Sequence, residues 1–217
     1  IFLYRGFGTL IEDCIVRNYN GDGISFQQSN DVSVVNCISQ GNTELGLHPG
    51  SGSQRPTVRG CIARDNGTDG LFLCWRVRHG LFEDNLLEDN GRFGISIGHK
   101  DTDNLLKKNI VRLNHRNGVF FRDESLGMAG HRNRLIENVI EDNGREPGTA
   151  AIRVSGETND LIFEGNVVRD TRKESTQKTQ TVGVLLEKSV GDVSMQGNQI
   201  DAVQTIVDER ETRSDDS

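Results

Sequence analysis

Chemically versatile side chains gather at three places in the middle of the sequence. They read Cys-Trp-Arg at residues 74–76, Gly-His-Lys-Asp at 98–101 and Arg-Asp-Glu at 122–124. Arginine and lysine can neutralise a carboxylate on a substrate, histidine or lysine can remove a proton, and an acid can protonate a leaving oxygen. These residue types therefore predict proton-transfer chemistry, provided that the fold brings the three places together.

A repeat connects these places. The pattern Gly-apolar-x-apolar recurs at steps of 23, 24, 24 and 24 residues, beginning at Gly23, Gly46, Gly70, Gly94 and Gly118. A second column keeps the same period up to residue 109 and then lengthens: Cys14, Cys37, Cys61, Asn85, Asn109, Asn138, Asn166 and Asn198. Two columns that share one period indicate one structural unit stacked on itself.

One such unit, residues 70–93, contains short extended runs, a sharp turn at Asn90-Gly91 and no sustained helical period. It cannot bury its apolar side chains alone, so stacking on its neighbours must make a continuous core. Parallel crossovers are almost always right-handed. We therefore predict an all-β fold, a single-stranded right-handed parallel β-helix of about eight coils. The Asn and Cys column suits an inward bend, where stacked amides can bond to one another.

The repeat also predicts the domain organisation. One array indicates one domain over residues 1–207, followed by a charged, disordered tail at 208–217. The longer repeats predict loops at 125–133, 142–149 and 171–180. Because the sequence starts close to a coil, we expect it to be part of a longer chain with an N-terminal cap.

Composition narrows the partners. The net charge is −7 and the sequence pI about 5.3, which argues against nucleic acid and anionic membranes as partners. No apolar run approaches the roughly 18 residues that a membrane span needs. We expect the four cysteines to be free thiols with a packing role.

Residues at equal offsets from the repeat glycine should stack about 5 Å apart along the axis. One outward column contains Ser25, His48, Phe72, Ser96 and Phe120. The three chemically versatile places follow this column on consecutive coils, and a loop histidine, His131, could fold back onto them.

The repeat resembles that of the pectin-lyase-like superfamily of right-handed β-helix proteins, and the resemblance covers essentially the whole chain. Residues 46–54, 69–77 and 94–103 look like an uncharacterised bacterial group within it. Polygalacturonases of this superfamily place adjacent aspartates and a Gly-His-Gly motif near their strands. This sequence lacks the aspartate pair, and Arg92-Phe93 stands where Gly-His would be. Alginate epimerases carry Asp-Pro-His after a strand glycine, of which only Pro49 is matched. The candidate site resembles the sites of pectate and alginate lyases in its residue types.

We therefore expect a protein that acts on an acidic, uronate-containing polysaccharide by lyase-type β-elimination. Arg76 and Arg122 would clamp the sugar carboxylate, Lys100 or His99 would be the base, and Asp101 would orient His99. The candidate catalytic residues are His99, Lys100, Asp101, Arg122, Arg76, Glu124 and Asp69. The candidate substrate-binding residues are His48, Trp75, Phe72, Phe120, Asp123 and His131.

Three alternatives stay open. An epimerase would use the same groups. An inverting glycoside hydrolase would use Asp22 and Asp69, which lie two coils, or roughly 9–10 Å, apart. A non-catalytic polysaccharide-binding shaft would need only the aromatic and polar surface.

We expect no cofactor. The alternatives are a Ca²⁺ site formed by Asp101, Asp103, Asp123 and Glu124, or a zinc site formed by His48, His99 and His131. Secretion or a periplasmic location follows from the class alone, because the sequence itself shows no export signal.

Overall fold

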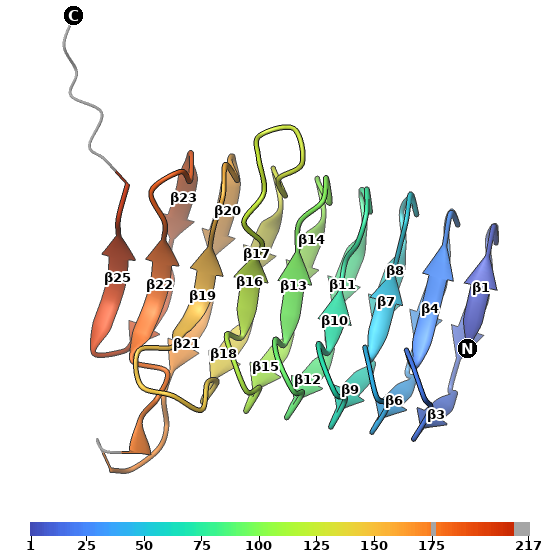
Figure 1. Ribbon diagram of the computed structural model, residues 1–217, viewed down its shortest axis with the longest axis horizontal. Helices are drawn as coiled ribbons and strands as arrows, with labels where there is room; N and C mark the ends of the chain where they lie inside the picture. The colour runs from blue at the N-terminus through green and yellow to red at the C-terminus, as the bar shows by residue number, and fades with distance from the viewer. Residues whose placement is uncertain (175–176, 211–217) are drawn as a thin grey trace, which may run out of the picture.

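The computed structural model describes residues 1–174 and 177–210, in which the chain winds as a regular coil of short strands (Figure 1). Three parallel sheets run along the axis, with nine, eight and eight strands in these described residues. Each full coil contributes one strand to each sheet, so the predicted parallel β-helix and its about eight coils are confirmed.

The first sheet faces the viewer in Figure 1. Its strands are β1 (Phe2–Tyr4), β4 (Ile24–Gln27), β7 (Leu47–Pro49), β10 (Leu71–Phe72), β13 (Ile95–Ile97), β16 (Val119–Phe121), β19 (Ala150–Val154), β22 (Val182–Leu186) and β25 (Gln204–Asp208).

The other two sheets complete each coil. The second sheet contains β2 (Leu10–Glu12), β5 (Ser33–Val35), β8 (Thr57–Arg59), β11 (Leu81–Glu83), β14 (Leu105–Lys107), β17 (Arg134–Ile136), β20 (Leu161–Glu164) and β23 (Val193–Gln196). The third contains β3 (Ile15–Arg17), β6 (Ile38–Gln40), β9 (Ile62–Arg64), β12 (Leu86–Glu88), β15 (Ile110–Arg112), β18 (Val139–Glu141), β21 (Val167–Arg169) and β24 (Gln199–Asp201).

The core is a narrow column inside the three sheets. In the first sheet Leu71 and Ile95 pair in register and are both fully buried, as the alternation in the sequence predicts. Phe82 and Phe163, from the second sheet, add large buried side chains. Since strands three residues long bury only one or two side chains each, stability depends on continuous stacking from coil to coil.

Stacked amides line two bends of every middle coil. In the predicted column, Nδ2 of Asn85 donates to Oδ1 of Asn109 at 2.9 Å and to the Val58 carbonyl at 3.0 Å. Cys61 occupies the same column one coil earlier, where its amide donates to Oδ1 of Asn85 at 2.9 Å. All four cysteines are free, as predicted.

A second amide ladder was not predicted. It follows the third sheet and contains Asn42, Asn66, Asn90, Asn114, Asn143 and Gln180. Its asparagines keep the 24-residue period up to Asn114, so the signal was present in the sequence. These side chains satisfy buried backbone groups at the bend that leads back to the first sheet.

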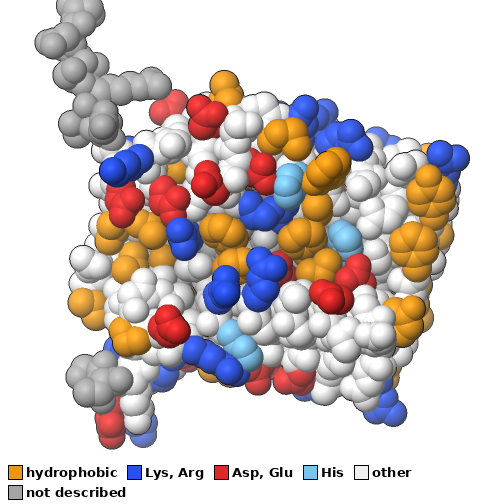
Figure 2. Space-filling view, in the orientation of Figure 1, with side chains coloured by type: hydrophobic (Ala, Val, Ile, Leu, Met, Phe, Trp, Pro, Cys, Tyr) orange, Lys and Arg blue, Asp and Glu red, His pale blue; other side chains and the backbone are white. Residues whose placement is uncertain are grey.

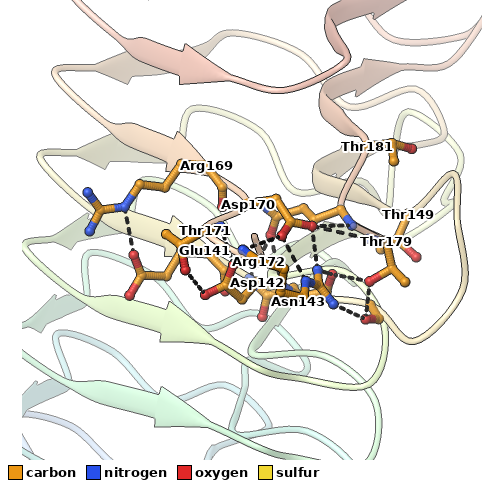
Figure 3. A network of polar contacts seen from close by, with 12 residues as sticks. Glu141, Asp142, Asn143, Thr149, Arg169, Asp170, Thr171, Arg172, Thr179 and Thr181 are labelled. Atoms are coloured by element: carbon orange, nitrogen blue, oxygen red, sulfur yellow. Dashed lines mark hydrogen bonds and ion pairs between the residues drawn. The ribbon is translucent and has the colours of Figure 1, made fainter. Parts of the chain in front are cut away.

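The predicted loops at 125–133 and 142–149 and the described residues of the loop at 171–180 lie between strands of successive sheets. Figure 3 shows how the loop at 171–180 is anchored. The buried Asp170 carboxylate accepts bonds from the Arg172 guanidinium at 2.7 and 2.5 Å, and from the amides of Thr179 and Gln180 at 3.1 Å. Burial opposes ionisation here, but these donors bring the pKa of Asp170 below its ordinary value.

The same anchor reaches the neighbouring loop. Arg172 Nη2 donates to the Asn143 carbonyl at 3.4 Å, and the Thr149 amide donates to the Thr179 carbonyl at 3.1 Å (Figure 3). The loops at 142–149 and 171–180 therefore brace each other.

The predicted start of the tail at residue 208 needs correction. Strand β25 includes Asp208, and Arg210 donates to its carboxylate at 2.8 and 2.6 Å. The rest of the tail predicted at 208–217, residues 211–217, lies outside the described residues.

Candidate functional site

Outward-facing residues of the first sheet form a column along the axis. Register pairs join Ser25 to His48, Phe72 to Ser96, and Ser96 to Phe120. Figure 2 shows basic, acidic, histidine and hydrophobic side chains intermingled over the middle of this face. Residues of separate coils therefore share one face, although the individual contacts differ from those expected.

The centre of the candidate site is a histidine paired with a carboxylate. His99 Nε2 lies 2.7 Å from Glu124 Oε1, and His99 Nδ1 lies 3.6 Å from the Cys74 sulfur. The Trp75 ring lies 5.5 Å from the His99 ring between centroids and is 45% exposed. An aromatic surface open to solvent thus adjoins a titratable base on neighbouring coils.

The surroundings of His99 favour its neutral form. Burial lowers the pKa of His99, the Arg122 charge lowers it further, and the Glu124 charge opposes both. Burial also raises the pKa of the Cys74 thiol to about 11, so the thiol stays protonated near neutral pH. With Glu124 accepting the Nε2 proton, the lone pair of His99 is on Nδ1, where the weak S–H donor faces it. In this tautomer Nδ1 is the basic nitrogen.

Asp101 does not orient His99, so that prediction was wrong. Its side chain is fully buried and accepts bonds from the Val77 amide at 2.9 Å and the Gly98 amide at 3.2 Å. Burial raises the pKa of Asp101 to about 7, although the nearby Arg122 opposes the shift. The carboxylate holds the bend after β13 in shape, and Glu124 takes the role expected of Asp101.

Arg122 is not an exposed carboxylate clamp. Only 11% of its side chain is exposed, and it donates to Ser96 Oγ at 2.8 Å, to the Leu73 carbonyl at 2.7 Å and to Asp101 at 3.2 Å. Its guanidinium carbon lies 4.5 Å from the Phe72 ring centroid. It ties three coils together and covers Ser96, which explains why this outward serine is buried.

Arg76 and Lys100 are the available cations at the site. Arg76 is exposed and Lys100 half-buried, and within residues 1–174 and 177–210 no ion pair joins either to a carboxylate. Their left-handed backbones, with φ of 60° and 65°, place them in the bend beside Trp75 and His99. The Arg76 amide donates to the His99 carbonyl at 2.9 Å, which fixes the two bends together.

A second histidine–carboxylate pair lies two coils earlier. His48 Nδ1 is 2.7 Å from Asp22 Oδ2 and 3.4 Å from Ser25 Oγ, and the ring packs edge-on against Phe72 at 5.4 Å. The sequence placed Asp22 and His48 in separate groups, because their 26-residue separation is not the coil period.

Asp69 is unavailable to a substrate. Its side chain is fully buried, accepts a bond from the Phe93 amide at 3.2 Å and lies 3.8 Å from Arg92, and burial raises its pKa. A glycosidic bond cannot reach this carboxylate, which argues against the inverting-hydrolase alternative and removes Asp69 from the candidate site. Phe120, which belongs to the outward column of the first sheet, packs against Phe93, with ring centroids 4.6 Å apart.

The remaining candidates lie apart from this centre. His131 bonds through Nε2 to the Leu126 carbonyl at 2.7 Å and accepts the Asn159 amide through Nδ1 at 3.1 Å, so it braces its own loop. Asp103 pairs with Arg132 at 2.7 Å, and Asp123 is exposed. In the described part of the chain, no three His, Cys, Asp or Glu residues are placed to hold a metal ion.

Sequence reasoning missed a pocket of about 480 Å³ at the start of β16 and β19. Its lining includes His115, Arg116, Arg145, Glu146 and Arg153. The pocket depends on how the loop at 142–149 folds against the preceding coil, and this inserted loop breaks the period that located the other residues.

Family membership follows from a comparison of sequences. Residues 1–126 match the family model described as a right handed beta helix region. This chain belongs to the right-handed β-helix family. Two curated relatives of Azotobacter vinelandii, the mannuronan C5-epimerases AlgE5 and AlgE2, are each 28% identical to this β-helix protein over 117 residues. That alignment covers 54% of this chain and only 12% of each relative's length.

Solved structures with the same winding agree with the fold. The A-module of the A. vinelandii mannuronan C-5 epimerase AlgE6 superimposes with a TM-score of 0.71 at 16% identity, covering 95% of this chain and 62% of that chain. The Streptococcus pneumoniae surface protein and adhesin PfbA gives a TM-score of 0.67 at 15% identity, covering 95% and 68%. At such identities these similarities establish the architecture alone.

One further property concerns membranes. Among the described residues of this β-helix protein, no helix has the length and apolar character that crossing a bilayer requires.

Proposed function

We propose that this β-helix protein acts on a uronate-containing polysaccharide bound along the outer face of its first sheet. The observation that carries the proposal is the His99–Glu124 pair at 2.7 Å beside the exposed Trp75. The pair supplies a base held in one tautomer, and the indole supplies a flat apolar surface for a sugar ring.

Charge favours an acidic sugar over a neutral one. Arg76 follows Trp75 and Lys100 follows His99 in the chain, and neither has a carboxylate partner in the described residues. In a protein with a net charge of −7, such local cations are needed to attract a polyanion. The curated relatives at 28% identity are named as enzymes of mannuronan, which supports the same substrate class.

The proposed reaction begins with removal of the C5 proton of a uronate residue. His99 Nδ1 accepts this proton, after the Cys74 thiol has turned aside, and the electron pair moves toward the sugar carboxylate. Arg76 and Lys100 neutralise the negative charge that develops there. The buried Arg122 adds a fixed positive field close behind the site.

Two products can follow from this carbanion. In a lyase, the bond from C4 to the glycosidic oxygen breaks and an acid protonates that oxygen, which leaves an unsaturated uronate. In an epimerase, C5 regains a proton from the opposite face. Elimination is the reaction that the residue types predict, whereas the similarity to two C5-epimerases favours the epimerase as a second candidate. His48, oriented by Asp22, lies two coils from His99, or roughly 10 Å along the axis, and would contact a neighbouring sugar of the same polymer.

We also propose that the protein works outside the cytoplasm, where such polymers occur. A structural relative described as a periplasmic alginate epimerase, with 14% identity and a TM-score of 0.62, is compatible with this location.

Binding and product analysis test the proposal. Wild-type protein, Trp75→Ala and His99→Gln are titrated with alginate and with a neutral glucan, and the ultraviolet absorbance of unsaturated uronate is followed. We expect binding of alginate alone, weakened about tenfold by Trp75→Ala. Product formation should fall about 10²–10⁴-fold in His99→Gln.

His79→Gln is the matched control, because His79 is exposed in the bend before β11. It should behave as wild type. Equal binding of the neutral glucan, or His99→Gln with unchanged activity, would contradict the proposal. Alginate binding without an unsaturated product would leave the epimerase or a polysaccharide-binding shaft.

A further inference from the structure

The pocket at the start of β16 and β19 is rich in arginine. Arg116, Arg145 and Arg153 all line its volume of about 480 Å³, together with His115, and Glu146 is the one carboxylate among the lining residues. Three guanidinium groups against one carboxylate form a concentrated positive region in a chain of net charge −7. Unless an anion binds there, these like charges repel one another.

The carboxylates nearby do not neutralise the cluster fully. Arg153 pairs with Glu187 at 2.6 Å, and His115 lies 3.2 Å from Asp89, but neither carboxylate lines the pocket. Within residues 1–174 and 177–210, no ion pair joins Arg116 or Arg145 to a carboxylate. Arg145 instead contacts the ring nitrogen Nε2 of His115.

The pocket is held in shape before any ligand binds. The Arg145 amide donates to the His115 carbonyl at 3.2 Å, and Asn117 Nδ2 donates to the Ala150 carbonyl at 2.7 Å. On its far side the Gly148 amide donates to Thr181 Oγ1 at 3.0 Å. The Asp170 anchor of Figure 3 braces the same loop from the next coil. Such preorganisation reduces the entropy lost on binding.

The pocket borders the same outer face as the candidate site, since most of its residues precede β16 and β19, whereas His99 follows β13 and Glu124 follows β16. Arg153 is the register partner of Phe120, Phe120 of Ser96, and Ser96 of Phe72. Phe72 and Arg153 are therefore three coils apart, or roughly 14 Å along the axis. A polymer that lies along the first sheet over His99 would extend its next sugars toward this pocket.

From this geometry we propose that the arginine pocket is a subsite for the carboxylate or sulfate group of an acidic sugar several residues along the same polymer. This subsite rests on the proposed function, since it assigns a second contact to the substrate bound at His99. Arginine suits the role because its planar fork donates two parallel bonds to a carboxylate or sulfate. The subsite would favour long polymers over short fragments, because only long chains reach both regions.

The test compares Arg116→Gln/Arg145→Gln with wild type in calorimetric titrations of alginate oligosaccharides of increasing length. We expect the double variant to bind long oligosaccharides about 10–100-fold more weakly, because it loses one or two charge-assisted contacts. Its affinity for a disaccharide should equal that of wild type. Added salt should reduce the difference between the two proteins.

Arg169→Gln is the matched control. Arg169 is an exposed arginine, as Arg116 and Arg145 are, and it pairs with Glu141 at 2.8 Å on the third sheet, away from the pocket. This variant should bind as wild type does. Unfolding temperatures of all variants establish that the fold is kept.

The outcomes separate the two proposals. If the double variant binds long oligosaccharides as tightly as wild type while Trp75→Ala weakens binding, the subsite is wrong and the proposed function stands. If wild-type protein binds no acidic polymer, both are wrong. Equal weakening of every oligosaccharide length would also contradict the subsite, since a disaccharide bound at His99 should not reach the pocket.

Discussion

At the residue scale, the chemistry of the site depends on which partners hold the two histidines. His99 and His48 each contact a carboxylate at 2.7 Å, and each lies against an aromatic ring. A paired carboxylate fixes the tautomer of a histidine and leaves the other nitrogen for proton transfer. Both pairs are therefore suited to act as base or acid on a bound sugar.

Removing the charge of Glu124 should lower the pKa of His99 further. The Glu124 carboxylate raises this pKa, while burial and Arg122 lower it, so Glu124→Gln leaves only the lowering effects. A pH titration of the His99 ring by NMR measures the change. Asp123→Asn, which alters the exposed neighbour, should leave the titration unchanged. A higher pKa in Glu124→Gln would contradict the pairing.

The buried Asp101 should make stability depend on pH. Its pKa rises from 3.8 in an ordinary environment to about 7 in the folded protein, mainly because of burial. The stabilising contribution of the protonated group is complete below a pH of about 4 and is lost as the pH rises through about 7. Asp101→Asn cannot ionise, so its unfolding temperature should rise relative to wild type over that interval. Thermal unfolding across the pH range tests this, and a constant difference would be the contrary result.

The residue types of the site were readable from the sequence, but the pairing was not. Arg122, His99 and Glu124 all occur where the repeat predicts. Which carboxylate faces His99 depends on the direction of each side chain at a bend, and the repeat does not specify this. Asp101 turned inward because two backbone amides there needed an acceptor.

At the element scale, each coil is held by its amide ladders as much as by its apolar side chains. Asn90 shows this most fully, because its Nδ2 donates to Asn114 Oδ1 at 2.9 Å and to the Ala63 carbonyl at 3.0 Å. Its Oδ1 accepts from both the amide and the Nδ2 of Asn66. One side chain thus satisfies buried groups on both neighbouring coils.

Asn90→Ala should destabilise the protein by roughly 2–4 kcal/mol, since several buried groups lose their partners at once. Asn20→Ala should cost less than about 0.5 kcal/mol, because Asn20 makes one exposed bond, to Thr43. Chemical denaturation of the two variants measures both changes. If the free energy of unfolding fell by a similarly small amount in both variants, the amide ladder would not be a main source of stability.

The elements were predictable where the period was constant. Between residues 23 and 121 the glycine and asparagine columns located strands, bends and register. The inserted loops broke the period, so the arginine pocket beside residues 142–149 was not foreseen. Side chains from loops of irregular length come together only through packing, which leaves no regular spacing in the sequence.

At the scale of the whole molecule, the β-helix presents one long face on which separate coils act together. His48, Phe72, Phe120 and Arg153 belong to four different coils of the first sheet. A polymer matches this geometry better than a small molecule, because each coil can contact a different sugar. The overall negative charge leaves the cationic regions of this face as the attractive ones for a polyanion.

The most direct test of the central claim is solvent deuterium uptake at C5 of a uronate polymer, followed by NMR in heavy water. Removal of the C5 proton precedes both elimination and epimerisation. With wild-type protein we therefore expect either deuterium at C5 or an unsaturated product that has lost the C5 hydrogen. His99→Gln should reduce this rate about 10²–10⁴-fold, and His79→Gln should not. Polymer that stays unchanged at C5 with wild-type protein, despite tight binding, would contradict proton chemistry at His99.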